Sequence, residues 1–169
     1  MGAPEWRLEI LAGVKPLLRQ LGFSGSRTRF RKTVGHRAFY VQFLGGSDQH
    51  DTDKLSMQVL LGVDFADLAG EEFGIEKSAY LTLWSGWLPW QNAQGVREGD
   101  WRAYTREEAT TVLEGIKKAL PEALATMDRK FQTWHDVLVY LDRRVGATFD
   151  LPGKVNEFLL PKAVPDQLR

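Results

Sequence analysis

The feature that most constrains the fold of this sequence is a strict alternation of residue types between positions 54 and 65. Successive side chains of a strand point to opposite faces, so this period of two predicts a β-strand with one fully apolar face and one mixed face. A sheet built on such a strand is expected to pack helices on its apolar side. The apolar set is Leu55, Met57, Val59, Leu61 and Val63, which alternates with Ser56, Gln58, Leu60 and Gly62.

Four further strands are expected around this one. Residues 27–33 and 37–44 read as a pair joined at Gly35, and residues 79–84 and 101–104 read as later strands separated by a loop rich in Gly and Trp. The alternation puts Arg27, Arg29, Arg31 and Thr33 on one face of the first strand. On the second strand it puts Arg37, Phe39, Val41 and Phe43 on one face, and Ala38, Tyr40, Gln42 and Leu44 on the other.

Helical periodicity flanks the strands on both sides. Residues 4–21 are predicted to form a helix that Pro16 kinks or splits and that Gly22 ends as a C-cap. Thr105 and Glu108 have the spacing of a capping box and begin a second helix, which Pro121 should end or kink. The expected apolar stripes are Leu8, Leu11, Val14, Leu18 and Leu21 in the first helix, and Val112, Leu113, Ile116, Leu120 and Leu124 in the second.

The order of elements is a helix, then antiparallel strands, then helices, and this order favours an α+β fold. We predict an antiparallel sheet of four to five strands, packed on one face by the N-terminal helix and by C-terminal helices. At 169 residues the chain fits one domain. Residues 1–150 are assigned to that domain, and residues 151–169 to a C-terminal extension packed on the domain or on a neighbour.

Charge and composition exclude several classes of function. Lys+Arg and Asp+Glu are both 22, so any binding of nucleic acid or of an acidic membrane would need a local cluster of charge. The chain has no cysteine, which removes disulfides, thiolate nucleophiles and Cys-ligated zinc. We find no signal-peptide pattern and no apolar run near the roughly 20 residues that span a bilayer. A cytoplasmic protein without a membrane partner or a cofactor is therefore expected.

Several segments together resemble a known family. They are "VKPLLRQLGFSGSRTRFRK", "AFYVQFLGGS", "LSMQVLLGVDF" and "DWRAYTREEATTVLEGIKKALPEALATMDRKFQTWHDVLVYL". Over residues 8–142 the chain resembles the bacterial domain-of-unknown-function family 4304. Residues 84–100 depart from the pattern by their many tryptophans, and the stretch after Arg144 lies outside it. The resemblance implies an α+β fold and implies no activity.

Tryptophans form the first candidate binding site. Trp84, Trp87 and Trp90 recur at three-residue spacing, with Trp101 nearby. They suit a platform for a partner protein, or a pocket for an apolar or sugar-like ligand, because Trp is enriched at the energetic centres of interfaces. Alternatively, one or two of them fill the core beneath a long loop. The sequence leaves both interpretations open.

Arginines form the second candidate site. Arg27, Arg29 and Arg31 could contact phosphates while Tyr40 stacks on a base, which predicts nucleic-acid binding. Alternating arginines are also how an outer sheet face stays solvated and resists edge pairing.

Acidic residues in one loop raise the question of a metal. Asp48, His50, Asp51 and Asp53 offer oxygen and imidazole ligands, but the EF-hand glycine and distal Glu are missing. Acidic residues are common in such loops for turn formation alone, so we expect no metal. The sequence also lacks a P-loop, G-x-G-x-x-G, G-x-S-x-G and H-E-x-x-H.

These observations favour a non-catalytic protein–protein interaction domain, of which a bacterial immunity-like or stress-associated protein would be one version. The expected partner is a protein, bound by Trp84, Trp87 and Trp90 with arginines of the first strand as a polar rim. One alternative is nucleic-acid binding through the Arg-rich strand 27–33. Another is an enzyme with an assembled carboxylate or metal site. The oligomeric state is not indicated.

Overall fold

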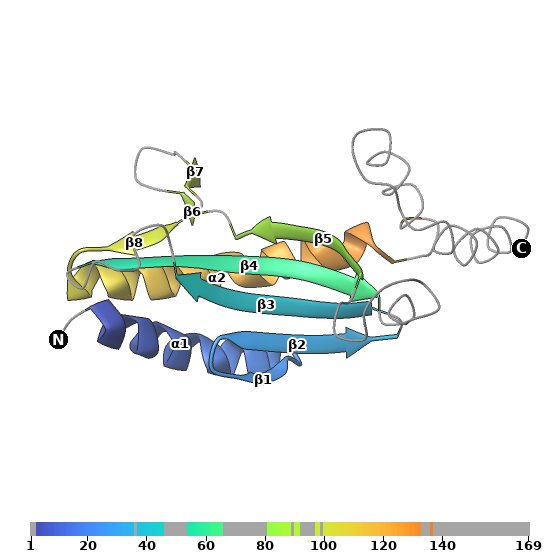
Figure 1. Cartoon of the computed structure of the whole chain (residues 1–169), viewed down its shortest axis with the longest axis horizontal. Coiled ribbons are helices and arrows are strands. Elements are labelled where there is room, and N and C mark those ends of the chain that lie inside the picture. The colour runs from blue at the N-terminus through green and yellow to red at the C-terminus, as the bar shows by residue number, and fades with distance from the viewer. Residues whose placement is uncertain are drawn as a thin grey trace, which may run out of the picture.

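The computed structural model has an α+β arrangement, as predicted, and describes residues 3–35, 37–45, 54–65, 81–88, 90–91, 97–98, 100–132 and 136. The two helices contact each other and lie on one face of an antiparallel sheet (Figure 1). In chain order the elements are α1 (Ala3–Gln20), β1 (Ser24–Ser26), β2 (Arg29–Val34), β3 (Arg37–Gly45), β4 (Leu55–Phe65), β5 (Leu81–Trp87), β6 (Trp90–Gln91), β7 (Arg97–Glu98), β8 (Trp101–Ala103) and α2 (Arg106–Lys130).

The sheet has the order β1-β2-β3-β4-β5, and every neighbouring pair is antiparallel. One edge of β4 pairs with β3, and its other edge is shared by two strands. β8 pairs with Leu55–Met57, and β5 pairs with the part of β4 from Leu60 to Phe65. β6 and β7 form a separate two-stranded sheet. β5 extends three residues into the segment expected to be loop, and β1 was not predicted.

The core lies between the sheet and the two helices. The apolar face predicted for β4 is confirmed, because Leu55, Met57, Val59, Leu61 and Val63 are each at most 2% exposed. β2 and β3 add aromatic residues to the same layer, where the rings of Phe30 and Phe43 meet edge to face at 6.1 Å between centroids. Alternation in the three strands therefore builds one continuous apolar layer beneath the helices.

The buried stripe of α1 differs from the predicted one. Trp6, Ile10, Val14 and Leu18, spaced by four residues, are buried in the core, whereas Leu8 is 66% exposed. The predicted stripe was compatible with helical spacing, but the contacts of α1 with α2 and the sheet set the rotation of the helix. α1 is one continuous helix through Pro16, so the prediction of a split is wrong.

The end of α1 is a Schellman motif, as the glycine after the helix indicated. Gly22 has a positive φ of 86°, which costs little without a Cβ. Its N–H donates to the carbonyl oxygen of Arg19 at 3.0 Å, and the N–H of Phe23 donates to that of Leu18 at 2.8 Å. These two bonds satisfy carbonyls that the last helical turn leaves free.

The start of α2 is also as predicted. The hydroxyl of Thr105 accepts a hydrogen bond from the backbone N–H of Glu108 at 3.2 Å, and the carboxylate of Glu108 accepts one from the N–H of Tyr104 at 2.6 Å. Together these contacts satisfy two backbone donors near the helix start, as in a capping box.

Pro121 does not end α2, so the first of the two predicted outcomes, an end at the proline, is wrong. The helix continues to Lys130, although a proline removes one backbone hydrogen bond. Its buried stripe includes Ile116 before the proline and Leu124 and Met127 after it. Burial of both halves against the same sheet offsets the missing bond. The C-terminal extension, residues 151–169, and the loop that contains Asp48, His50, Asp51 and Asp53 lie outside the described residues.

Candidate binding surface on the outer sheet face

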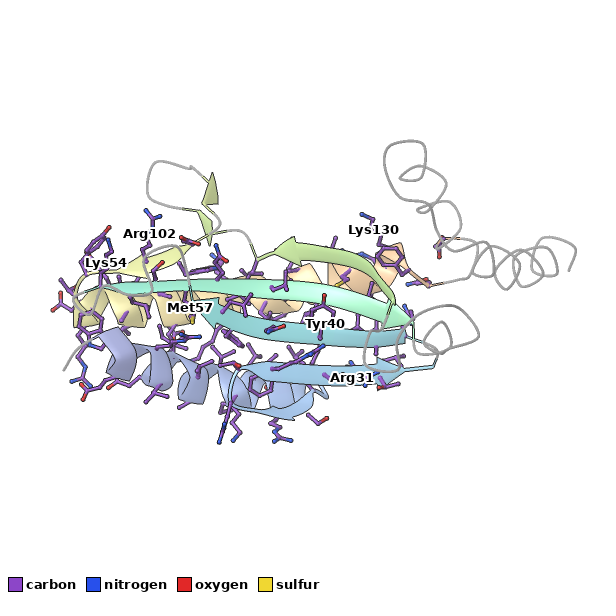
Figure 2. The ribbon with its side chains drawn as sticks, in the orientation of Figure 1. Arg31, Tyr40, Lys54, Met57, Arg102 and Lys130 are labelled. Carbon is purple, nitrogen blue, oxygen red and sulfur yellow. The ribbon has the colours of Figure 1, made fainter. Side chains whose placement is uncertain are left out.

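The face of the sheet opposite α1 and α2, here called the outer face, collects residues from both candidate sites. β2 and β3 contribute the positions that alternate with their buried aromatics, and Figure 2 shows Arg31 and Tyr40 on these two strands. β4 contributes the mixed positions of its alternation. The set is Arg29, Arg31, Thr33, Ala38, Tyr40, Gln42, Leu44, Ser56, Gln58, Leu60 and Gly62.

Strand register joins the arginine strand to the Trp-rich segment. Arg29 pairs with Gln42, Gln42 pairs with Leu60, and Leu60 pairs with Trp87. One row across four strands therefore holds an exposed arginine at one end and the backbone position of a tryptophan at the other. The sequence alone gave no sign of this row, because it depends on the pairing of β4 with β5.

Tyr40 lies across the middle of the outer face. A Cβ on Gly62, its cross-strand partner, would overlap the ring of Tyr40, so only glycine leaves room for the ring over β4. The guanidinium carbon of Arg29 lies 5.5 Å from the ring centroid, within cation–π range. Tyr40 is 6% exposed, so the ring is covered. The predicted stacking of a nucleic-acid base on Tyr40 therefore has no accessible surface.

Arg27 lies outside this face. It occupies the two-residue loop between Ser26 and Arg29, where β1 folds back on β2, and has a positive φ of 56°. Two-residue hairpin loops favour positive φ because it matches the twist of the strands. The expected strand start at residue 27 is therefore wrong, and of the three arginines Arg29 and Arg31 remain on the face.

Trp101 belongs to the core. It is 1% exposed, and its indole N–H donates to the carbonyl oxygen of Leu88 at 3.2 Å. Its ring lies against α2, where a Cβ on Gly115 would stand 2.9 Å from the ring. Trp101 is therefore assigned to the packing between β8 and α2, and it offers no surface to a partner.

The other three tryptophans occupy different backbone positions. Trp84 pairs with Val63, a position of the helix-facing layer, and Trp87 pairs with Leu60 of the outer face. Trp90 lies in β6 and pairs with Glu98. Trp87 is therefore the one member of the predicted platform whose register matches the outer face.

A polar group that the sequence did not indicate closes one end of the outer face. Asp100, just before β8, is 7% exposed and accepts a hydrogen bond from the amide of Gln58 at 2.5 Å. The other carboxylate oxygen of Asp100 lies 3.5 Å from the guanidinium of Arg102. In the pairing of β4 with β8, Arg102 is the backbone partner of Ser56. These groups bind one another across β4 and β8, so they stabilise the sheet.

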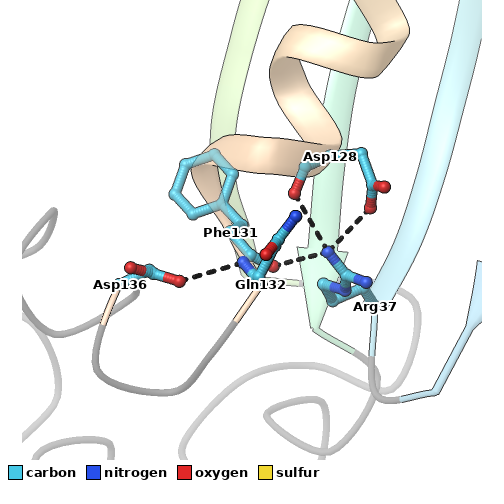
Figure 3. Close-up of polar contacts among 5 residues, drawn as sticks. All are labelled: Arg37, Asp128, Phe131, Gln132 and Asp136. Atoms are coloured by element: carbon cyan, nitrogen blue, oxygen red, sulfur yellow. Dashed lines mark hydrogen bonds and ion pairs between the residues drawn. The ribbon is translucent and has the colours of Figure 1, made fainter.

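Arg37 is the other polar residue that sequence reasoning missed, and its role is structural (Figure 3). Its Nη1 donates to the carbonyl oxygens of Phe131 at 2.6 Å and Asp128 at 3.2 Å, and to the Asp128 carboxylate at 2.8 Å. The guanidinium therefore caps the C-terminus of α2, where a cation is favoured. Next in the chain, the N–H of Gln132 donates to the carboxylate of Asp136 at 3.1 Å.

The described residues also bear on metal binding and on membrane spanning. Within the part of the chain that the structure describes, no three His, Cys, Asp or Glu side chains gather in a way that could hold a metal ion. Asp48, His50, Asp51 and Asp53 lie outside that part. Neither of the two described helices is long and apolar enough to cross a membrane.

Comparison with known proteins gives no relative. No protein-family model matches the chain, and no curated protein or solved structure matches it. The resemblance to family 4304 stays a prediction.

Proposed function

We propose that this protein is a non-catalytic interaction domain and that its outer sheet face binds a protein partner. The observation that carries the proposal is that both described helices lie on the same face of the sheet. The side chains of Arg29, Gln42 and Leu60 therefore lie on the side away from both helices, in the row whose backbone register continues to Trp87.

The composition of the outer face supports a protein as the partner. It combines Arg29 and Arg31 with amides and leucines, and Gln42, Leu44, Gln58 and Leu60 are each partly exposed. Protein interfaces are enriched in Arg, and two outer-face positions of β2 hold Arg29 and Arg31. A partner protein would bury the leucines while Arg29 lies at the rim.

Nucleic acid is the second candidate, and Arg29 and Arg31 on one face are the observation in its favour. Two arginines supply few phosphate contacts, and the net charge of the chain is zero. Base stacking on Tyr40 is also blocked by its burial. The outer face therefore suits a protein better.

Site-specific photo-crosslinking inside the native cell tests the proposal. A photo-reactive amino acid replaces Gln42, in the middle of the row, and a matched control carries it at Lys118, which is exposed on α2. We expect one discrete adduct from position 42, sensitive to protease and resistant to nuclease, and no such adduct from position 118. Arg29→Glu and Leu60→Asp should each reduce it.

Three results would contradict the proposal. The same background from positions 42 and 118 would mean that the outer face has no partner. An adduct removed by nuclease would favour nucleic acid, and its binding should then weaken with salt, by a log–log slope of about −0.7 per phosphate contacted on a single strand. An adduct unaffected by Arg29→Glu and Leu60→Asp would place the contact elsewhere.

A further inference from the structure

A cavity of about 280 Å³ opens on the helix side of the sheet, away from the outer face. It lies where the end of α1, the C-terminal half of α2 and strands β2 and β3 meet. In Figure 1, α1 ends before the far end of β2, whereas α2 continues beyond the end of α1. The sheet beyond the end of α1 is therefore covered by α2 and by the residues that follow Gly22.

Apolar side chains form most of the wall. Phe23 and Phe39, both 4% exposed, and Leu124, 9% exposed, are its buried members, and α2 adds Pro121 and the exposed Ala125. Small-molecule sites combine such walls with a few polar groups, at volumes of roughly 300–1,000 Å³. This cavity is just below that range, so it suits a small ligand.

Lys32 is a charged residue of the cavity wall. It pairs with Phe39 in the register, so it lies on the helix-facing side of β2 and lines the cavity. It is partly buried and makes no hydrogen bond or ion pair with the residues that the structure describes. Its end passes Gly22, just after α1, where a Cβ would stand 3.5 Å from Cε and 3.7 Å from Nζ. An ammonium that has no ion-pair partner gains a charge-assisted hydrogen bond when an anion binds to it.

The charge around the cavity favours an anion. Asp128 also lines it, but the Asp128 carboxylate lies 2.8 Å from Nη1 of Arg37. Lys32 is therefore the charged residue of the lining that has no counter-charge among the described residues, and a ligand with one negative charge would supply it.

We propose that the cavity binds a small monocarboxylate with an apolar tail, the carboxylate paired with Lys32 and the tail packed against Phe23, Phe39 and Leu124. This site is independent of the proposed partner surface, because it lies on the other face of the sheet. Each CH₂ added to a tail that still fits should raise affinity about fourfold, the factor expected for burying one methylene.

Titration calorimetry with octanoate, hexanoate and octan-1-ol tests the chemistry of the ligand. Octanoate should bind the wild-type chain one to one. We expect octan-1-ol to bind about tenfold more weakly, because it has the same tail without the charge. Hexanoate should bind about sixteenfold more weakly, from two methylenes. Absence of saturable octanoate binding, or equal affinity for octanoate and octan-1-ol, would overturn the proposal.

Three variants test the place of binding. Lys32→Met keeps the length of the side chain and should remove the preference for octanoate over octan-1-ol. Ala125→Leu adds volume at an exposed wall position and should weaken both ligands. Lys118→Met, which removes an exposed lysine of α2 that does not line the cavity, should leave both affinities unchanged. Thermal melts confirm that each variant is folded, and octanoate affinity unchanged by both Lys32→Met and Ala125→Leu would place the ligand elsewhere.

Discussion

The contact between Arg37 and the C-terminus of α2 gives the sharpest prediction about stability. One guanidinium nitrogen reaches two backbone carbonyls and one carboxylate, and the Arg37 side chain is 16% exposed. The last carbonyls of a helix have no partner within it, so an external donor there has a clear role. Arg37→Met keeps most of the apolar stem. It removes the guanidinium, which is the donor and whose carbon lies 5.2 Å from the ring centroid of Phe39.

The magnitude follows from which acceptors are buried. A hydrogen bond from a charged donor contributes about 1.5–3 kcal/mol. The three contacts share the two N–H groups of Nη1, so they are worth fewer than three full bonds. The Asp128 side chain is 52% exposed, and an exposed ion pair adds roughly 0–1 kcal/mol. We therefore expect Arg37→Met to lower the free energy of unfolding by about 2–3 kcal/mol, and Asp128→Asn to lower it by less than about 1 kcal/mol.

Urea unfolding monitored by far-UV circular dichroism measures both changes. Arg106→Met is a matched control, since Arg106 forms an ion pair with Glu9 at 3.2 Å between two exposed side chains, and it should change stability by less than about 0.5 kcal/mol. If Asp128→Asn is as damaging as Arg37→Met, the ion pair and not the helix cap holds α2. If Arg37→Met matches Arg106→Met, the cap has no measurable role.

Three other predictions concern packing, and thermal melts with urea titrations check them. Leu8→Lys should change stability by less than about 0.5 kcal/mol because Leu8 is exposed. A loss above about 2 kcal/mol would mean that Leu8 is buried in the core. Gly115→Ala should cost about 1–3 kcal/mol, since its Cβ would stand 2.9 Å from the buried ring of Trp101. Gly13→Ala should be within about 1 kcal/mol of wild type: its Cβ would meet the flexible end of Leu113 at 2.7 Å, and the gain in helix propensity offsets this. Equal effects of the two glycine changes would contradict the distinction.

Local signals predicted the elements whose causes are local. The alternation in β4, the glycine after α1 and the capping pair Thr105 and Glu108 each act within a few residues, and all three are in the structure. The rotation of α1 was missed because apolar residues at helical spacing lie on more than one face. Which of Trp6 and Leu8 is buried depends on α2 and the sheet, which the helix sequence alone does not specify.

The candidate surface could be predicted only in part, because it depends on strand register. Alternation separated Arg29 and Arg31 from Phe30 correctly, and this needed only the period of two. The row that ends at Trp87 needed the pairing of β4 with β5, which no local pattern specifies. The burial of Trp101 needed the close approach of α2 at Gly115, which is equally non-local.

Two residues of β2, three positions apart, allow the two proposals to be tested independently. Arg29 lies on the outer face and Lys32 on the helix-facing side, because the parity of their positions differs along one strand. Arg29→Glu should therefore reduce the adduct from position 42 and leave octanoate affinity unchanged. Lys32→Met should do the reverse. Loss of both activities in either single variant, with the fold intact by circular dichroism, would mean that partner and carboxylate share one site, which the register of β2 with β3 does not allow.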